Sequence, residues 1–202
     1  MKILKLRTLR GPNYWSISRH KLVIMRLDLE DLDEKYTSDI PGFYKGLTEV
    51  LPSLVEHCCS PGVKGGFLSR VEKGTLMGHV IEHVALELQQ LARMPVVFGR
   101  TRETSTPGVF QVVIEYVNEH AGRYAARAAV RLCQSIVETG TYSEIELEKD
   151  LEDLKEFKNQ ASLGPSTEAI VKEAEARGIP WTQLGARFVI CLLYTSDAAD
   201  ED

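Results

Sequence analysis

The chain has 202 residues, of which 44% are hydrophobic and 26% are charged, and its formal net charge at pH 7 is −5. These values are ordinary for a globular protein with one good-sized core, and no apolar stretch approaches the roughly 18 residues that a membrane span requires. The N-terminus alternates charged and apolar residues, unlike a secretory signal, and four cysteines without a paired framework indicate a reducing compartment. We therefore expect a cytoplasmic protein that binds neither membranes nor nucleic acid.

The first third of the chain predicts two strands and a helix. Residues 2–7 and 21–29 are rich in apolar and β-branched side chains, and a Gly-Pro-Asn turn lies between them. Apolar residues then recur at helical spacing from Pro41 to about residue 57, which predicts a helix. The Pro and Gly residues of 60–66 predict a loop that leads into a second helix around residues 76–91.

The middle of the chain continues this alternation. Residues 95–98 predict a short strand, 99–107 a polar loop, and 109–117 a strand with alternating apolar residues. Asn118 is expected to cap a long alanine-rich helix that ends near residue 138, and an acidic helix follows it. The expected class is α+β, a sheet with helices packed on it, followed by the incomplete start of a further domain.

The C-terminal part divides into two expected segments. A Gly-Pro-Ser sequence at 164–166 opens a new unit with a helix and a strand, so we place a domain boundary near residue 160. Residues 191–202 resemble the translation of a sequencing adapter, and leaving out their four acids moves the formal charge from −5 to −1. We thus expect segments 1–160, 161–190 and 191–202, and a natural sequence that continues beyond residue 190.

The sequence His79-Val-Ile-Glu82-His83 has the spacing of a metal-hydrolase helix. Two imidazoles at i and i+4 rise about 6 Å along a helix and share one face, so both can bind one cation. Glu82 lies beside them and could accept a proton from a metal-bound water. This His-x-x-Glu-His pattern is typical of inverted zinc peptidases. The alternative interpretation is that these are three polar residues on a solvent-exposed helix face.

A catalytic zinc ion usually has three protein ligands and one open position. Cys59 is our first choice for the third ligand, because it follows a helix end and precedes a glycine-rich loop that could fold back. Glu87, one turn beyond His83, is the alternative, and His57 is a weaker one. Cys58 and Cys59 could equally be ordinary buried thiols.

In seven ordered segments the chain resembles cyanophycin synthetase, and the resemblance extends over residues 1 to about 185. The segments are LRGPNYWS at 9–16, MRLDL at 25–29, IPGF at 40–43, LPSL at 51–54, MGHVIEH at 77–83, FGRTRE at 98–103 and LGPST at 163–167. Members of this family polymerise cyanophycin, a poly-aspartate with arginine on each side chain. They are expected to have an N-terminal domain, an ATP-grasp domain that adds aspartate, and a Mur-ligase-like domain that adds arginine.

The resemblance implies that this chain is the N-terminal domain with the opening of the ATP-grasp domain. It implies binding of cyanophycin, hydrolysis that uses Zn²⁺ at His79 and His83 with Glu82 as base, and a homo-oligomeric full-length protein. ATP and Mg²⁺ would be bound only by the missing part. Alternatives are a non-catalytic polymer-binding module and a free-standing zinc peptidase.

Three arginines are candidate substrate-binding residues. Arg100 and Arg102 lie in a family segment, and planar guanidinium groups suit bidentate binding of carboxylates. Arg127 lies in a ridge of arginines spaced four residues apart, between Arg123 and Arg131. A solvated loop and a solvated helix face are the alternative interpretations.

Overall fold

The computed structural model describes residues 1–11, 13–17, 20–59, 62–160, 164–179, 181–184 and 188–191. They belong to two compact units, Met1–Lys158 and Asn159–Asp202, and each is described by itself. Among these residues no helix combines the length and the apolar character needed to cross a bilayer.

The first unit is built on one antiparallel sheet with the strand order β1-β2-β4-β3. Its strands are β1 (Lys2–Leu9), β2 (Leu22–Asp28), β3 (Gly99–Glu103) and β4 (Val109–Glu115). The central strands alternate, so that Met25, Leu27 and Val112 enter the main core with the helices. The expected α+β class is confirmed.

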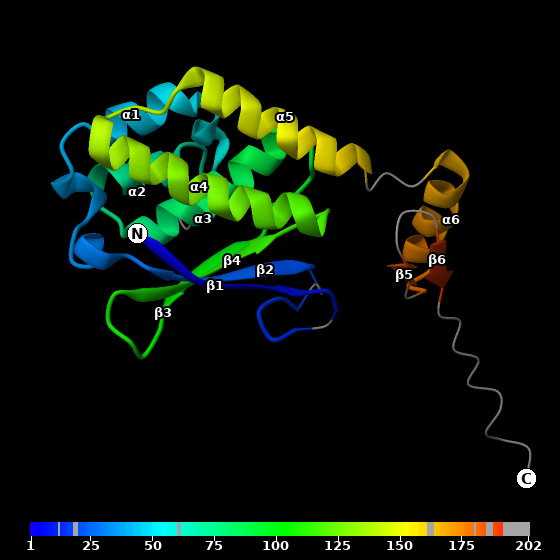
Figure 1. Ribbon diagram of the computed structural model, residues 1–202. Coiled ribbons are helices and arrows are strands. Elements are labelled where there is room, and N and C mark those ends of the chain that lie inside the picture. Colours follow the sequence, from blue (N-terminus) through cyan, green and yellow to red (C-terminus); the bar gives the residue numbers. More distant parts are fainter. Residues whose placement is uncertain are drawn as a thin grey trace, which may run out of the picture. The chain divides into compact units, whose positions relative to one another are not determined.

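Helices lie on one face of this sheet (Figure 1). They are α1 (Phe43–Val50), α2 (Gly66–Lys73), α3 (Met77–Leu91), α4 (Glu119–Thr139) and α5 (Glu144–Gln160), with short 3-10 turns η1 (Glu30–Leu32), η2 (Thr37–Asp39) and η3 (Pro52–Glu56). Helix α3 packs on β3, β4 and α4, and α4 also contacts β2. Asn118 caps α4 as expected, since its side chain accepts a hydrogen bond from the Ala121 amide at 2.9 Å.

The acidic helix α5 is fixed to α4 through one buried acid. Asp150 is 3% exposed and accepts hydrogen bonds from Tyr124, Tyr142 and Arg131, each at 2.7 Å. A buried carboxylate with three donors is compensated for the loss of water. Helix α5 is therefore part of the first unit, whereas the sequence favoured a solvated helix or a linker.

The other face of the sheet is largely polar. Trp15 is buried at one end of it, against Ile24 and Val113. Cross-strand register places Arg102 opposite Gln111 and Gln111 opposite Arg26, which in turn lies opposite Lys5. Five exposed cations share this face, here called the basic face: Lys5, Arg7, Arg26, Arg100 and Arg102.

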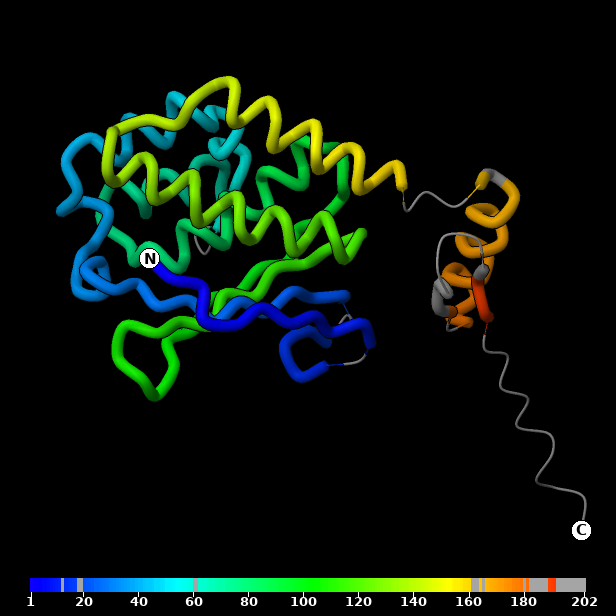
Figure 2. Tube along the Cα trace, viewed as in Figure 1, coloured from blue at the N-terminus to red at the C-terminus, as the bar shows by residue number. Residues whose placement is uncertain are grey.

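The second unit contains helix α6 (Pro165–Ala176) and a two-stranded antiparallel sheet of β5 (Trp181–Leu184) and β6 (Phe188–Cys191). Helix α6 is the orange helical segment of the tube in Figure 2. Gly178, with φ 67°, lies two residues after its end. The expected adapter-derived segment lies, after its first residue, outside the described residues.

Two expected elements before α3 are wrong. The helix predicted from Pro41 to residue 57 is two pieces, α1 and η3, because Pro52 disfavours the helical conformation of Leu51, which has φ −128° and ψ 70°. The loop predicted at 60–66 does not lead directly into α3, because the eight-residue helix α2 lies between them. So short a helix shows too few turns for its periodicity to be recognised.

The third error concerns the segment around Arg100. Residues 99–103 form strand β3, where a polar loop was predicted, and residues 95–98 are not a strand. The side chains of Arg100 and Arg102 lie on the basic face. Thr101 and the Cα atom of Gly99 lie on the opposite face, against α3. Pairing with β4 decides this structure, because strand preference depends more on neighbouring strands than on local composition.

Candidate metal centre

Helix α3 holds the His-x-x-Glu-His residues inside the first unit. Its apolar residues Val80, Ile81 and Val84 are completely buried, which fixes the rotation of the helix against the sheet and α4. The imidazoles of His79 and His83 lie on the face directed at α2 and the segment before it, with ring centroids 4.8 Å apart.

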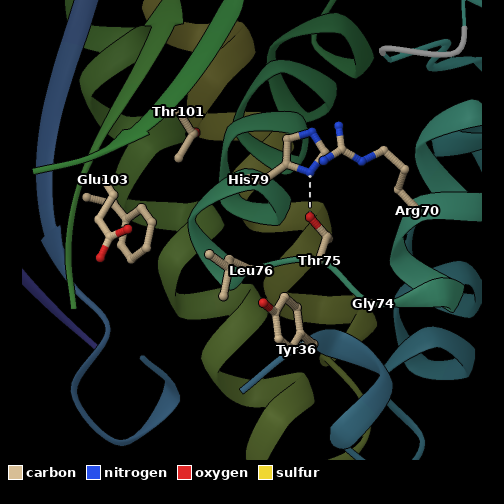
Figure 3. A pocket seen from close by; sticks show the side chains of 9 residues that line it. Tyr36, Arg70, Gly74, Thr75, Leu76, His79, Thr101 and Glu103 are labelled. Atoms are coloured by element: carbon tan, nitrogen blue, oxygen red, sulfur yellow. Dashed lines mark hydrogen bonds between the residues drawn. The ribbon is translucent and has the colours of Figure 1, made fainter. Parts of the chain in front are cut away.

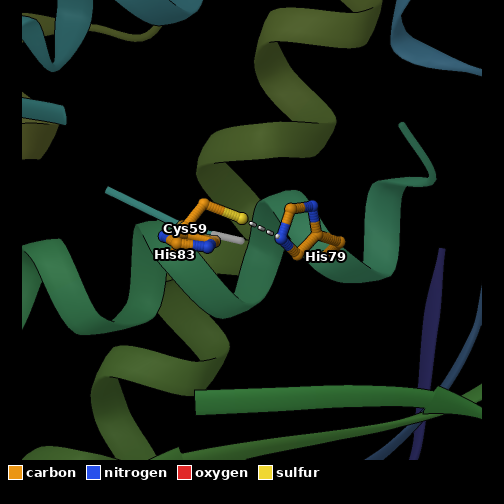
Figure 4. A group of neighbouring side chains, drawn as sticks. All are labelled: Cys59, His79 and His83. Atoms are coloured by element: carbon orange, nitrogen blue, oxygen red, sulfur yellow. Dashed lines mark hydrogen bonds between the residues drawn. The ribbon is translucent and has the colours of Figure 1, made fainter. Parts of the chain in front are cut away.

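Cys59 completes a group of three possible metal ligands (Figure 4). One donor atom from each of Cys59, His79 and His83 lies within 4.8 Å of the others, and the thiol Sγ is 3.3 Å from His79 Nε2. Phe67 of α2 stacks on the His83 ring at a centroid distance of 4.0 Å and restricts its rotation.

The backbone at Cys59 is unusual. Its φ of 52° is in the left-handed region, which non-glycine residues seldom adopt. Gly62 donates its amide hydrogen to the Cys59 carbonyl at 3.1 Å. Strained conformations of this kind persist where the surrounding structure imposes them, and the Cys59 thiol lies 3.3 Å from His79 Nε2.

The donor set fits zinc. With Zn–N bonds of about 2.0 Å and a Zn–S bond of about 2.3 Å, a tetrahedral ion keeps its donor atoms roughly 3.5 Å apart. The 3.3 Å between Cys59 Sγ and His79 Nε2 is close to this separation. All three donor atoms lie within 4.8 Å of one another, so small side-chain rotations would bring them to the zinc-binding distances. Two imidazoles and one thiolate also leave a fourth position open, as in catalytic zinc sites.

Both histidines are in the protonation state that a metal requires. Burial, and then the charge of Arg70, lowers the pKa of His79 to about 4. Burial, with the neighbouring His79 and His57, lowers the pKa of His83 to about 2. Neutral imidazole is the metal-binding form, so neither ring has to lose a proton at pH 7.

Glu82 lies on the side of α3 that faces β3. It is 6% exposed, and Thr101 donates a hydrogen bond from its hydroxyl to the carboxylate at 2.7 Å. Only a glycine fits opposite, since a Cβ atom on Gly99 would lie 2.7 Å from Glu82 Cγ. Burial raises the pKa of Glu82 to about 7, against the Thr101 hydrogen bond and the charges of Arg100 and Arg70. A carboxyl group with this pKa can both accept and release a proton near neutral pH.

A pocket of about 420 Å³ opens beside His79 (Figure 3). His79 and Thr101 both line it, so the pocket reaches one of the three candidate metal ligands and the partner of Glu82. Arg70 and Glu103 also line the pocket, so it contains one positively charged and one negatively charged side chain. Arg70 further donates a hydrogen bond to Cys59 Sγ at 3.6 Å.

The raised pKa of Glu82 predicts a pH-dependent stability of the metal-free protein. Between about pH 4.5 and 7 the native state holds the Glu82 proton while the unfolded state loses it, so the free energy of unfolding falls as pH rises. The loss amounts to about 3 kcal/mol, at 1.36 kcal/mol per pKa unit. Glu82→Gln has no such proton to lose, so the free energy of unfolding of the variant, relative to that of the parent, should increase between pH 4.5 and 8. Urea unfolding in the presence of a chelator measures this difference. A stability difference that stays constant over this range would contradict the assignment.

The structure places the predicted site residues in three locations. The structure brings Cys59, His79 and His83 together, and Glu82 is next to them on the same helix. Arg100 and Arg102 are on the basic face, on the other side of the sheet from α3. Arg127 is exposed on α4, and its neighbour in the expected ridge, Arg131, is ion-paired with Asp150 at 2.7 Å.

Sequence reasoning did not identify several residues of the centre. Thr75, whose Oγ1 is 3.1 Å from His79 Nδ1, and Thr101 are common polar residues that no motif singles out. Arg70 lies on the unpredicted helix α2. The alternative ligands His57 and Glu87 hydrogen-bond to each other at 2.7 Å, behind His83.

Comparison with known proteins gives one consistent result. Residues 24–138 match the family described as cyanophycin synthase-like N-terminal domain. The cyanophycin synthetases of Trichormus variabilis, Crocosphaera subtropica and Synechocystis sp. are 71%, 69% and 68% identical to this chain over 194 residues. The matches cover 96% of the chain and 22% of each relative, so the chain spans about a fifth of their length.

Proposed function

Since this chain belongs to the cyanophycin synthetase family, whose N-terminal part it contains, we propose that its first unit binds cyanophycin and hydrolyses it at a zinc site. The convergence of Cys59, His79 and His83 on one point beside an open pocket is the observation that carries this proposal. Cleavage would supply shorter chains whose ends can serve as primers.

The chain's own residues have separate roles in this proposal. A zinc ion held by the three ligands would supply Lewis acidity, which polarises a carbonyl group and makes water more acidic. Glu82 accepts the proton of the attacking water and passes it to the departing amine, for which its near-neutral pKa is suited. Thr101 holds the carboxylate in place through its 2.7 Å hydrogen bond.

The pocket suits a polymer that carries both charges. Each cyanophycin unit presents the carboxylate and the guanidinium group of an arginine. Arg70 can bind the carboxylate in a bidentate manner, and Glu103 can accept hydrogen bonds from the guanidinium group. A pocket with one basic and one acidic side chain therefore favours cyanophycin over a polymer whose side chains all carry charges of the same sign.

Chelation tests the proposed hydrolysis directly. The chain is incubated with purified cyanophycin, and soluble fragments are measured by mass spectrometry. We expect fragments from the zinc-loaded chain, a loss of this activity with EDTA, and its return when zinc is added back. An equal yield of fragments with and without EDTA, or no fragments from the zinc-loaded chain, would overturn the proposal.

A second candidate, a polymer-binding module, is favoured by the basic face. No carboxylate group lies within 4 Å of its five cations among the residues that the structure describes. Its guanidinium groups also stand over aromatic rings, Arg102 over Trp15 at 5.3 Å and Arg100 over Phe98 at 6.0 Å. We propose that this face holds the carboxylates of the polymer, a role that does not require cleavage at the metal centre on the other side of the sheet.

Removing both arginines of β3 is expected to weaken binding of cyanophycin. Exposed charge pairs contribute about 0.2–1 kcal/mol each, so Arg100→Ala with Arg102→Ala should raise the Kd by roughly two- to thirtyfold at low salt. Sedimentation with insoluble cyanophycin at two salt concentrations measures this, and Lys45→Ala on α1 is the control for a lost exposed charge. Arg127→Ala tests the α4 position separately. If the β3 double variant binds like Lys45→Ala, the basic face does not hold the polymer.

We propose further that the whole protein is a cytoplasmic, homo-oligomeric ligase that uses ATP and Mg²⁺ to join arginine and aspartate. Those ligands would bind in the ATP-grasp part, of which the second unit of this chain would be the beginning. A reducing compartment agrees with the four cysteines, none of which forms a disulfide in the part of the chain that the structure describes.

A further inference from the structure

A buried row of hydrogen bonds leads away from the metal centre behind His83. His83 Nδ1 is 2.8 Å from His57 Nδ1, and His57 Nε2 is 2.7 Å from Glu87 Oε2. The hydroxyl of Ser53 donates to the other carboxylate oxygen of Glu87. His57 is 9% exposed and Glu87 only 2%, so water does not compete for these contacts.

Glu87, at one end of this row, determines which nitrogen atoms carry the protons. Burial would raise the pKa of Glu87, but hydrogen bonds from His57 and Ser53 outweigh burial and lower it. An ionised carboxylate only accepts hydrogen bonds, so His57 donates from Nε2. When the His57 ring is neutral, its Nδ1 has no proton and accepts, so that the proton between the two rings belongs to His83 Nδ1.

We propose that His57, held by Glu87, is a positioning residue for the metal centre: it accepts the Nδ1 proton of His83 and thereby keeps His83 Nε2 free to bind the ion. The inference rests on the proposed metal site, but it does not require that the protein cleaves cyanophycin. Metal-bound histidines generally donate their second N–H to a carboxylate, a carbonyl or a water, which fixes the tautomer and the ring orientation. Here the acceptor is an imidazole that a carboxylate holds in place.

The two histidines of the motif differ in this respect. His79 Nδ1 has the hydroxyl of Thr75 at 3.1 Å, a neutral partner that can donate or accept. His83 instead has an imidazole that is itself bound to a carboxylate. The row therefore specifies one tautomer of His83, whereas Thr75 leaves both tautomers open to His79.

Zinc affinity of the full chain, measured by competition with a chromophoric chelator, tests the proposal. His57→Ala is expected to raise the Kd for zinc by roughly 10- to 100-fold, as for other partners of metal ligands. His57→Asn keeps an oxygen that can accept from His83 and should fall between the parent and His57→Ala. His120→Ala, on α4, is the control for a lost histidine. An unchanged Kd for His57→Ala, or equal losses for the Ala and Asn variants, would overturn the proposal.

The tautomer can also be read in the unmutated protein, should the variants fold poorly. Long-range proton–nitrogen correlations of the metal-free chain show which nitrogen of each imidazole carries the hydrogen. The expected result is a proton on Nδ1 of His83 and on Nε2 of His57. A proton on Nε2 of His83 would contradict the assignment.

These results are separable from those of the proposed function. If the parent binds zinc with the expected tautomer but releases no fragments, cleavage is wrong and the role of His57 stands. If the parent binds no zinc, the metal site itself is wrong, and the role of His57 with it. If the parent binds zinc and cleaves while His57→Ala has the parent's affinity, only the role of His57 fails.

Discussion

Glu82→Gln is expected to lower the rate of cyanophycin cleavage by roughly 100- to 10,000-fold, the usual contribution of a general acid–base group. The substitution keeps the shape of the side chain and can keep the hydrogen bond from Thr101, but the amide cannot take up a proton. Zinc content should stay at that of the parent, because Glu82 is not among the three proposed ligands. The measurement is the initial rate of fragment release by the zinc-loaded proteins.

Glu72→Gln is the matched control for this substitution. Glu72 is an exposed acid on α2, outside the candidate centre, and its replacement should leave the rate unchanged. Equal rates for the parent and Glu82→Gln would remove Glu82 from the mechanism. Loss of bound zinc in Glu82→Gln would instead make this residue part of the metal site.

Cys59→Ser is expected to weaken zinc binding by more than 100-fold. Apparent binding free energies of about 10–16 kcal/mol for four-ligand zinc sites correspond to roughly 3 kcal/mol for each ligand, and a serine hydroxyl is a poor substitute for a thiolate on zinc. Cleavage should fall with zinc occupancy and recover in part at high zinc concentration. Chelator competition measures the affinity.

The adjacent Cys58 provides a close control for that variant. Its thiol is exposed and contacts the Glu56 carbonyl oxygen at 3.7 Å, away from the histidines. Cys58→Ser should therefore bind zinc like the parent. A larger loss of affinity for Cys58→Ser than for Cys59→Ser would mean that the ligand has been assigned to the wrong cysteine.

Local pattern was sufficient to predict the central helix and its motif. Helix α3 is long and periodic, and His79 and His83 at i and i+4 share a face in any helix. Cys59 was the preferred third ligand on the basis of its place at a helix end. Its convergence with the histidines depends on a left-handed backbone and on the packing of α2, neither of which the sequence displays.

Features that depend on distant parts of the chain could not be predicted. Thr101 reaches Glu82 only because β3 pairs with β4, and β3 has no apolar alternation of its own. The five cations of the basic face come from three strands, so cross-strand register alone collects them. His57 and Glu87 were considered as ligands, but their 2.7 Å contact with each other follows from the tertiary packing of η3 on α3.

The ligand set of the bound ion is the most direct test of the central claim. X-ray absorption at the zinc edge of the reconstituted chain counts the sulfur and nitrogen atoms around the metal. We predict one sulfur and two imidazole nitrogens, with the sulfur lost in Cys59→Ser and kept in Cys58→Ser. A zinc environment without sulfur in the parent, or one that is unchanged when both His79 and His83 are replaced by alanine, would contradict the metal centre described above.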